Sequence, residues 1–197
     1  MNMMKDINVV YTDTGVHFEG APSHQIMMFW EDPLMQEHAL HLTKSTSGSH
    51  EILELGFGLG MSAQHIYDLH KDYPDYHHTI YEIHHTIAEE ARKWASDKPQ
   101  VTIVEKDWAE DVETINRKDY DGIFFDTHRD KWARMFKKYV VDHSLKCGGV
   151  FTYFYGGTDD VYELGPTVKM TFVKVDPKDC SYFRGDTFPC PYYIKNC

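Results

Sequence analysis

The chain has 197 residues, of which 42 % are hydrophobic and 26 % charged, values that suit one soluble globular domain with a full core. The formal net charge of −11 argues against a nucleic-acid partner, because binding to a phosphate backbone needs a basic face. The sequence has neither a long apolar run nor a start typical of a signal peptide, so we expect a cytoplasmic protein without a membrane span.

The N-terminal part is predicted to form a β-hairpin followed by a helix. The stretch "INVVYTDTGVHFEG" contains two short strands around a turn at "DTG". The helix is expected in "DPLMQEHALHLTKS", where Pro33 suits the first turn and apolar residues recur at helical spacing. We assign residues 1–48 to this unit and expect it to cap a pocket.

From residue 51 onward, short apolar strands alternate with helices. The strands are expected in "EILEL", "HHTIYEI", "VTIVEKD", "YDGIFFD" and "GVFTYFY". The helices are expected in "MSAQHIYDLHKDY", "TIAEEARKWAS", "DVETI" and "DKWARMFKKYVVDHSLK", the last of them stopped by Gly148 and Gly149. This alternation predicts parallel strands joined by right-handed crossovers, with residues 49–155 as the core of a single domain 1–197.

The C-terminal part, residues 156–197, has a different character. "TVKMTFVKV" and "YYIKN" read as strands with no helix between them, which predicts antiparallel pairing at one edge of the sheet. Only a short helix fits before them, in "DDVYELGP". The fold class is therefore α/β and Rossmann-like: a mostly parallel seven-stranded sheet with an antiparallel C-terminal edge and a short N-terminal hairpin. Because the four cysteines lack CxxC spacing, we expect free thiols at Cys147, Cys180, Cys190 and Cys197.

A glycine-rich turn links the first core strand to its helix in "ILELGFGLGMSA". Gly56, Gly58 and Gly60 allow a tight turn and let a ligand approach the backbone closely. The third glycine comes one residue too early for a dinucleotide fingerprint, so the pattern does not favour a pyrophosphate. An ordinary strand–helix turn without a ligand is the simpler alternative.

The next two strand ends favour a ligand. Glu82 ends the second core strand and could accept hydrogen bonds from ribose hydroxyls. Asp107 and Trp108 follow the third strand and suit the amino group and the ring of adenine. Together these positions predict a nucleoside ligand without phosphates. S-adenosylmethionine fits this description, and the order of the positions resembles that in class I methyltransferases.

Two further acids point to the methyl acceptor. Asp126 ends the fourth core strand, and Glu31 lies in "MMFWEDPLM", where the neighbouring Asp32 is better suited to the helix start. Two carboxylates beside a methyl donor suggest a planar cation such as a guanidinium. His128 could line the same pocket or make a structural hydrogen bond. The spacing of the thirteen histidines gives no metal-binding pattern, so we expect no metal.

At this point the chain resembles a known family, the guanidinoacetate N-methyltransferases, which make creatine. The stretches that carry the resemblance are "MMFWEDPLM", "ILELGFGLG", "IYEI", "DWAEDV", "DGIFFDTH", "KCGGVFTYF" and "PKDCSYF", in this order. The resemblance implies that Glu31 and Asp126 hold the guanidino group and that Asp126 accepts its proton. It implies a donor site formed by Met27, Met35, Glu54, Gly56, Phe57, Gly58, Leu59, Gly60, Glu82, Ile83, Asp107, Trp108 and Asp126, and contacts of Gly157 and Thr158 with the acceptor's carboxylate.

The chain also departs from the family pattern. Its N-terminal segment is shorter, "YGGT" replaces "NLTS" after the fifth strand, and a helix that follows in the family is missing. The expected function is S-adenosylmethionine-dependent methylation of a small cationic guanidino compound, guanidinoacetate or a related one, with S-adenosylhomocysteine as product. Peptidyl arginine, as in the similar core of fungal-type protein arginine methyltransferases, or another small amine is the alternative acceptor. A non-catalytic domain that binds the donor or a partner is a further alternative. We expect a monomer or a homodimer.

Overall fold

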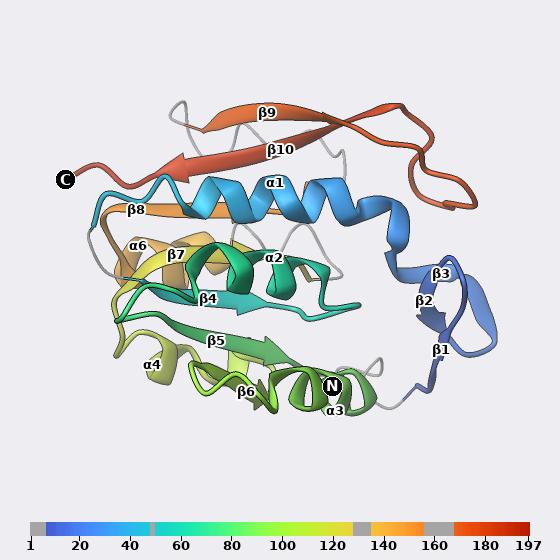
Figure 1. Ribbon diagram of the computed structural model, residues 1–197, viewed down its shortest axis with the longest axis horizontal. Coiled ribbons are helices and arrows are strands. Elements are labelled where there is room, and N and C mark those ends of the chain that lie inside the picture. Colours follow the sequence, from blue (N-terminus) through green and yellow to red (C-terminus); the bar gives the residue numbers. More distant parts are fainter. Residues whose placement is uncertain (1–6, 48–49, 128–134, 156–167) are drawn as a thin grey trace.

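The computed structural model describes residues 7–47, 50–127, 135–155 and 168–197, which form two β-sheets flanked by helices (Figure 1). Within these residues the larger sheet has the strand order β6–β5–β4–β7–β8–β10–β9, and the smaller has the order β1–β2–β3. The larger sheet consists of β4 (Glu51–Leu55), β5 (His77–Glu82), β6 (Val101–Glu105), β7 (Tyr120–Phe125), β8 (Leu145–Tyr153), β9 (Lys169–Lys174) and β10 (Thr187–Ile194).

The larger sheet confirms the predicted fold class. Strands β4 to β8 pair in parallel, whereas β10 is antiparallel to both β8 and β9. Strand β10 inserts between β8 and β9, so β9 is the outer strand. All six residues of the central strand β7 are buried, as expected where helices cover both faces of a parallel sheet.

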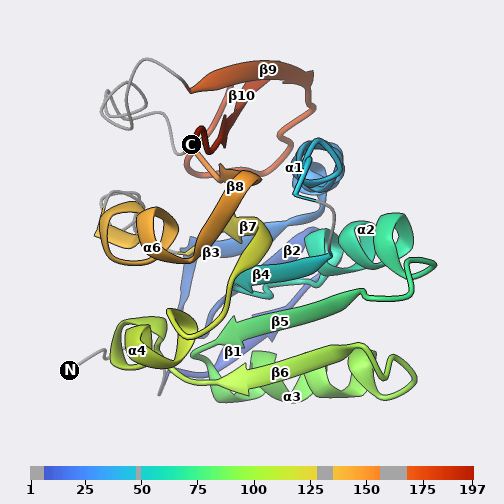
Figure 2. The ribbon, with the colours of Figure 1, turned by 90° about the vertical axis from the view of Figure 1, so that its left-hand side faces the viewer.

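Helices cover the two faces of this sheet (Figure 2). One face carries α1 (Asp32–Leu42), α2 (Met61–His70) and α3 (His85–Ala95), and the other carries α4 (Val112–Ile115), the π-helical turn η4 (Lys137–Val141) and α6 (Asp142–Ser144). Phe124 and Phe125 are adjacent in β7 and belong to separate apolar clusters, one on each face, because successive side chains of a strand point to opposite sides.

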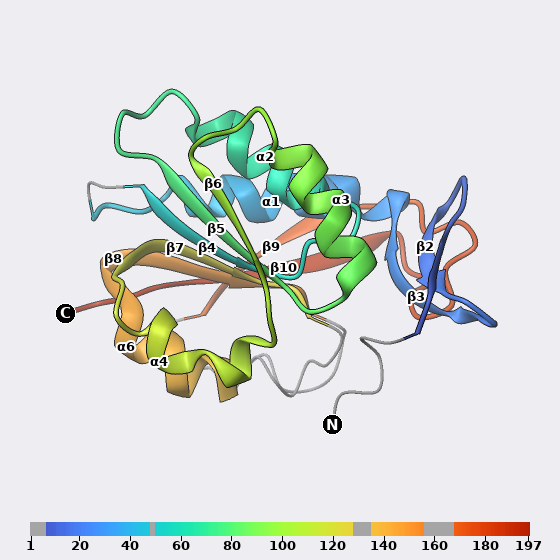
Figure 3. The ribbon, with the colours of Figure 1, turned by 90° about the horizontal axis from the view of Figure 1, so that it is seen from below.

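The predicted N-terminal hairpin is a three-stranded sheet in the structure. Its strands are β1 (Val9–Tyr11), β2 (Gly15–Phe18) and β3 (Ala21–Met28), and they are paired antiparallel. Only the last two residues of β3 are fully buried, so this strand has no apolar alternation that the sequence analysis could detect. Figure 3 shows the small sheet at one end of the molecule, beyond the ends of β4 and β5, where ligands bind in such folds.

Two expectations about the C-terminal half need correction. The helix expected up to Gly148 ends at Ser144, and β8 begins at Leu145, before the glycines. Gly148 has a positive φ of 79° and donates its N–H to the carbonyl of Lys195, so it belongs to the sheet margin, where only glycine adopts this conformation without strain. The short helix expected in "DDVYELGP" and part of the preceding long helix lie outside the described residues.

The expectation of four free thiols is also wrong. Cys147 and Cys197 form a disulfide, with their Cα atoms 5.6 Å apart, while Cys180 and Cys190 are free. The two bonded residues are 50 positions apart and become neighbours because the chain after β10 runs beside the start of β8. Among the described helices, none has the length and apolar character needed to cross a membrane.

Candidate active site

The ends of the parallel strands bring the predicted donor-binding residues together. Gly56 follows β4, Glu82 is the last residue of β5, Asp107 follows β6 and Asp126 follows β7. These strands are neighbours and parallel, so all four residues lie at the same edge of the sheet, on the side of the small N-terminal sheet (Figure 1). The topology thus assembles residues that are up to 70 positions apart in sequence, from Gly56 to Asp126.

The glycine turn has the backbone conformation expected from its sequence. Gly56, Gly58 and Gly60 have φ values of 93°, 56° and 75°, a region that favours glycine. A Cβ atom on Gly56 would overlap with the main-chain oxygen of Asp126. The turn is therefore packed tightly against the end of β7.

Glu82 fixes the glycine turn through its carboxylate. One oxygen accepts a hydrogen bond from the N–H of Phe57 at 3.0 Å, and the other accepts one from the N–H of His84 at 2.8 Å. The side chain is buried, and burial raises its pKa although both bonds favour the charged form. Ile83 follows in the same connection. Each carboxylate oxygen has a further lone pair, which suits the ribose hydroxyls proposed as its partners.

Strand β3 supplies a second contact with the turn. The N–H of Leu59 points to Sδ of Met27 at 3.2 Å, and a Cβ atom on Gly58 would lie 2.8 Å from the same sulfur. Met27 therefore covers the turn directly, and its contact with the donor stays a prediction. Met35 lies one helical turn into α1 and is fully buried in the apolar cluster that also contains Met27.

Glu54 lies in a different environment from the other donor-site residues. Its side chain is fully buried; one carboxylate oxygen accepts a hydrogen bond from the hydroxyl of Ser62, and the other lies 2.9 Å from Nε2 of His78. These contacts tie β4 to α2 and β5. They place the Glu54 carboxylate inside the protein rather than at the edge where the ligand is expected.

Asp107 and Trp108 form the start of the short turn η3 (Trp108–Glu110). The Asp107 carboxylate caps this turn by accepting the N–H of Ala109 at 3.0 Å. The Trp108 ring packs edge to face against Phe136 and Phe125, with centroid distances of 5.0 and 6.0 Å, and is 9 % exposed. Most of the indole is therefore part of the core, and only a small part of it can face a ligand.

Glu31 is the most unusual acid of the site. It ends the turn η2 (Phe29–Glu31) and is only 3 % exposed. Its Oε1 atom accepts the N–H of Met28 at 2.7 Å and also the hydroxyl of Tyr182. Burial raises the pKa of Glu31 to about 7, against the opposing effect of these two hydrogen bonds.

Tyr182, the partner of Glu31 in the second of these hydrogen bonds, is not among the site residues predicted from the sequence. Burial raises its pKa well above the usual value, and the charges of Glu31 and Asp126 raise it further. Its hydrogen bond to Glu31 places the phenol beside this acid. Only its position in the family-like stretch "PKDCSYF" could have pointed to it.

Three predicted site residues, His128, Gly157 and Thr158, lie outside the described residues. The described part of the chain also contains no group of three or more side chains suited to hold a metal ion.

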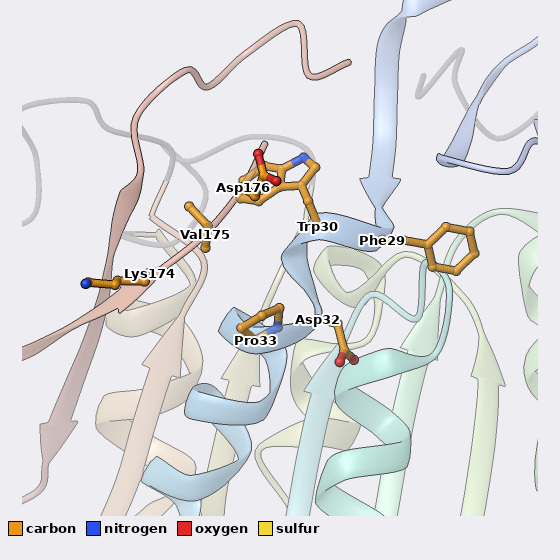
Figure 4. Close-up of a pocket in the computed structure, with 7 residues that line it drawn as sticks. All are labelled: Phe29, Trp30, Asp32, Pro33, Lys174, Val175 and Asp176. Carbon is orange, nitrogen blue, oxygen red and sulfur yellow. The ribbon is translucent and has the colours of Figure 1, made fainter. Parts of the chain in front are cut away.

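An open pocket of about 560 Å³ lies next to η2 and the start of α1 (Figure 4). Its lining comes from η2, the start of α1, and the end of β9 with the two residues that follow: Phe29, Trp30, Asp32, Pro33, Lys174, Val175 and Asp176. It includes neither Asp126 nor the glycine turn, so it is distinct from the donor site. Trp30 connects the two regions, because its ring also packs against Tyr182 at a centroid distance of 5.9 Å.

Comparison with known proteins shows which sequences the chain is similar to. The profile of the family described as "Guanidinoacetate N-methyltransferase" matches residues 2–158. Protein arginine N-methyltransferase 2 of Yarrowia lipolytica is 30 % identical over 200 residues, which cover 89 % of this chain and 41 % of that protein. The protein of the same name from Aspergillus oryzae is 29 % identical over 171 residues, which cover 79 % of this chain and 40 % of that protein. The chain thus spans about two fifths of the length of these relatives.

Solved structures share the fold. Precorrin-6y C5,15-methyltransferase from Geobacter metallireducens superposes with a TM-score of 0.60 and 17 % identity, over 81 % of this chain and 87 % of that one. Spermidine synthase from Thermotoga maritima superposes with a TM-score of 0.58 and 15 % identity, over 96 % of this chain and 72 % of that one.

Proposed function

The chain belongs to the guanidinoacetate N-methyltransferase family, and from this premise we propose that it transfers a methyl group from S-adenosylmethionine to a nitrogen of a guanidino group. The observation that carries the proposal is the position of two acids at the glycine turn. Asp126 ends β7 against Gly56, and the buried Glu31 accepts the N–H of Met28, whose neighbour Met27 contacts Leu59 of the turn. Binding the donor alone requires neither a buried Glu31 nor its hydrogen-bond partners.

The donor site fits S-adenosylmethionine. Glu82 offers two carboxylate oxygens that are already fixed by main-chain N–H groups, an arrangement suited to the two ribose hydroxyls. The glycine turn follows β4 at the edge of the sheet where the ligand is expected, and Asp107 and Trp108 would face the adenine. When bound, the donor supplies a methyl group on a positively charged sulfur, and S-adenosylhomocysteine remains after transfer.

Glu31 and Asp126 would hold the acceptor as a planar cation. A guanidinium presents several N–H groups in one plane and pairs well with carboxylates, which orient one nitrogen toward the methyl group. A protonated guanidinium is a poor nucleophile, so a proton must leave the attacking nitrogen as the new C–N bond forms. We assign the proton to Asp126, while Glu31 balances the remaining positive charge.

Guanidinoacetate, which would yield creatine, or a related small guanidino compound is our first candidate for the acceptor, because the family description names guanidinoacetate. Peptidyl arginine is the second candidate. It is favoured by the names of the curated relatives and by the open pocket beside Glu31, which has room for residues flanking an arginine. Asp32 and Asp176 in that pocket would suit a cationic peptide, although Lys174 offsets part of their charge.

A panel of acceptors tests the proposal. The purified chain is incubated with methyl-labelled S-adenosylmethionine and, separately, guanidinoacetate, free arginine, an arginine-containing peptide, its lysine counterpart and glycine. We expect label in a guanidino compound and none in the lysine peptide or glycine. Label in the arginine peptide alone would replace the first candidate by the second, and label in the lysine peptide would contradict the guanidino proposal. The cytoplasmic location and the monomeric or dimeric state stay predictions.

A further inference from the structure

The loop between β9 and β10, residues 175–186, carries a side chain into the acceptor site from a distant part of the sequence. Tyr182 donates its hydroxyl to Oε1 of Glu31, a contact between residues 151 positions apart. The phenol ring is supported by Trp30, whose indole also stacks on Phe183 at 5.8 Å. The contact is thus part of a packed aromatic group.

The same loop is fastened to β3. The side chain of Gln25 donates to the carbonyl of Asp179 at 2.7 Å and accepts the N–H of Ser181 at 2.8 Å. The hydroxyl of Ser181 donates to the carbonyl of Ser23 at 2.8 Å. These bonds flank Tyr182 on its N-terminal side, so they fix where its hydroxyl can reach.

The two hydrogen bonds on Glu31 select one orientation of its carboxylate. The N–H of Met28 and the hydroxyl of Tyr182 both meet Oε1, whereas Oε2 takes no hydrogen bond from the described part of the chain. Rotation of the carboxylate would break both bonds at a buried position, where unpaired polar groups are costly. Oε2 is therefore the atom left for another cation or donor.

We propose that Tyr182 is a positioning residue, which holds the Glu31 carboxylate turned so that Oε2 receives the N–H of the methyl acceptor. This inference rests on the proposed function of Glu31 as an acceptor-binding acid. It adds that the loop between β9 and β10 forms one wall of the acceptor site, through contacts that the order of motifs in the sequence does not show.

The test compares Tyr182→Phe with Tyr139→Phe. Tyr139 is a matched control because its ring is exposed and its hydroxyl makes no hydrogen bond within the described residues. In each variant we would measure kcat and KM for the acceptor over a range of pH, and the affinity for S-adenosylhomocysteine by calorimetry. The titration midpoint of Glu31 would be followed by NMR with carboxyl-labelled glutamate, assigned with Glu31→Gln.

Removal of the phenol hydroxyl should reduce kcat/KM for the acceptor by roughly tenfold or more, as for loss of a hydrogen bond to a charged group. The acidic limb of the pH profile and the midpoint of Glu31 should both move to higher pH, because the lost bond favoured the carboxylate. Affinity for S-adenosylhomocysteine should stay unchanged, and Tyr139→Phe should behave as wild type. Gln25→Ala, which keeps the phenol but unfastens the loop, should shift the same quantities in the same direction by less.

An unchanged midpoint and acidic limb in Tyr182→Phe would overturn the inference, and so would a loss of activity that parallels a loss of S-adenosylhomocysteine affinity. Failure of the proposed function gives a different result. In that case wild type labels no guanidino compound, while the NMR midpoint of Glu31 still moves in Tyr182→Phe and supports the positioning of Glu31.

Discussion

At the scale of single residues, the site combines acids whose carboxylate oxygens accept hydrogen bonds in different patterns. Glu82 has a main-chain donor on each oxygen, whereas Glu31 has two donors on one oxygen. The first arrangement fixes a turn, and the second leaves an oxygen for a ligand. Asp126 lies half-buried at the end of β7, where its backbone N–H donates to the carbonyl of Leu55 at 2.9 Å.

Asp126→Asn should abolish methyl transfer and keep the affinity for S-adenosylhomocysteine within about tenfold, equal to about 1.4 kcal/mol. The amide has nearly the same shape but cannot accept the acceptor's proton or balance its charge. Single-turnover labelling and calorimetry measure the two effects. A large loss of donor affinity would instead make Asp126 a donor-binding residue.

Glu31 should reduce the stability of the protein at high pH. Its pKa rises from 4.5 in the unfolded chain to about 7 in the folded protein, so the folded state holds more protons between these values. The free energy of unfolding therefore falls as pH rises through this window, by about 3 kcal/mol at most. The penalty is complete above pH 7 and absent below about pH 4.5.

Glu31→Gln should therefore raise the melting temperature more at pH 8 than at pH 5, although it should inactivate transfer. Thermal unfolding at both pH values measures this difference. Glu113→Gln, at an exposed position of α4, is the control and should show no such pH-dependent gain. An equal change at both pH values for Glu31→Gln would show that Glu31 is ionised in the folded state without penalty.

At the scale of elements, the glycine turn and strand β3 together shape the donor site. The turn was predictable, because three glycines between an apolar strand and a helix indicate a backbone conformation that other residues adopt with difficulty. Strand β3 was not predictable, because Pro22, Ser23 and His24 are exposed and interrupt any apolar alternation. Its role became visible only from the contact of Met27 with Leu59.

Gly56→Ala should disrupt the donor site more than an alanine substitution at a glycine that has only a positive φ. Alanine at this position meets both an unfavourable φ of 93° and the main-chain oxygen of Asp126. We expect a loss of about 2 to 5 kcal/mol in stability, together with loss of S-adenosylhomocysteine binding.

Gly20→Ala is the matched control for this substitution. Gly20 has a φ of 72°, and a Cβ atom there would meet no atom within 4 Å. It should cost only about 1 to 2 kcal/mol and leave donor binding intact. Thermal unfolding and calorimetry compare the two variants, and equal losses would show that close packing at Gly56 is unimportant.

At the scale of the whole molecule, local sequence patterns predicted the large sheet because each strand and helix carries its own signal. Apolar strands alternate with helices along the core of the chain, and this alternation predicts the parallel pairing of the strands. Contacts between distant segments left no such signal. The hydrogen bond between Tyr182 and Glu31 and the Cys147–Cys197 disulfide both depend on how β9 and β10 join the edge of the sheet beside β8, which no local pattern specifies.

The central claim is that Glu31 and Asp126 present a guanidino nitrogen to the methyl donor. Mass spectrometry of the product formed with isotope-labelled S-adenosylmethionine tests it most directly, because fragmentation locates the transferred methyl group. We expect the methyl group on a guanidino nitrogen, and no product from Asp126→Asn. A methyl group on an amine, a carboxylate or a ring nitrogen, or a product formed equally by Asp126→Asn, would contradict it.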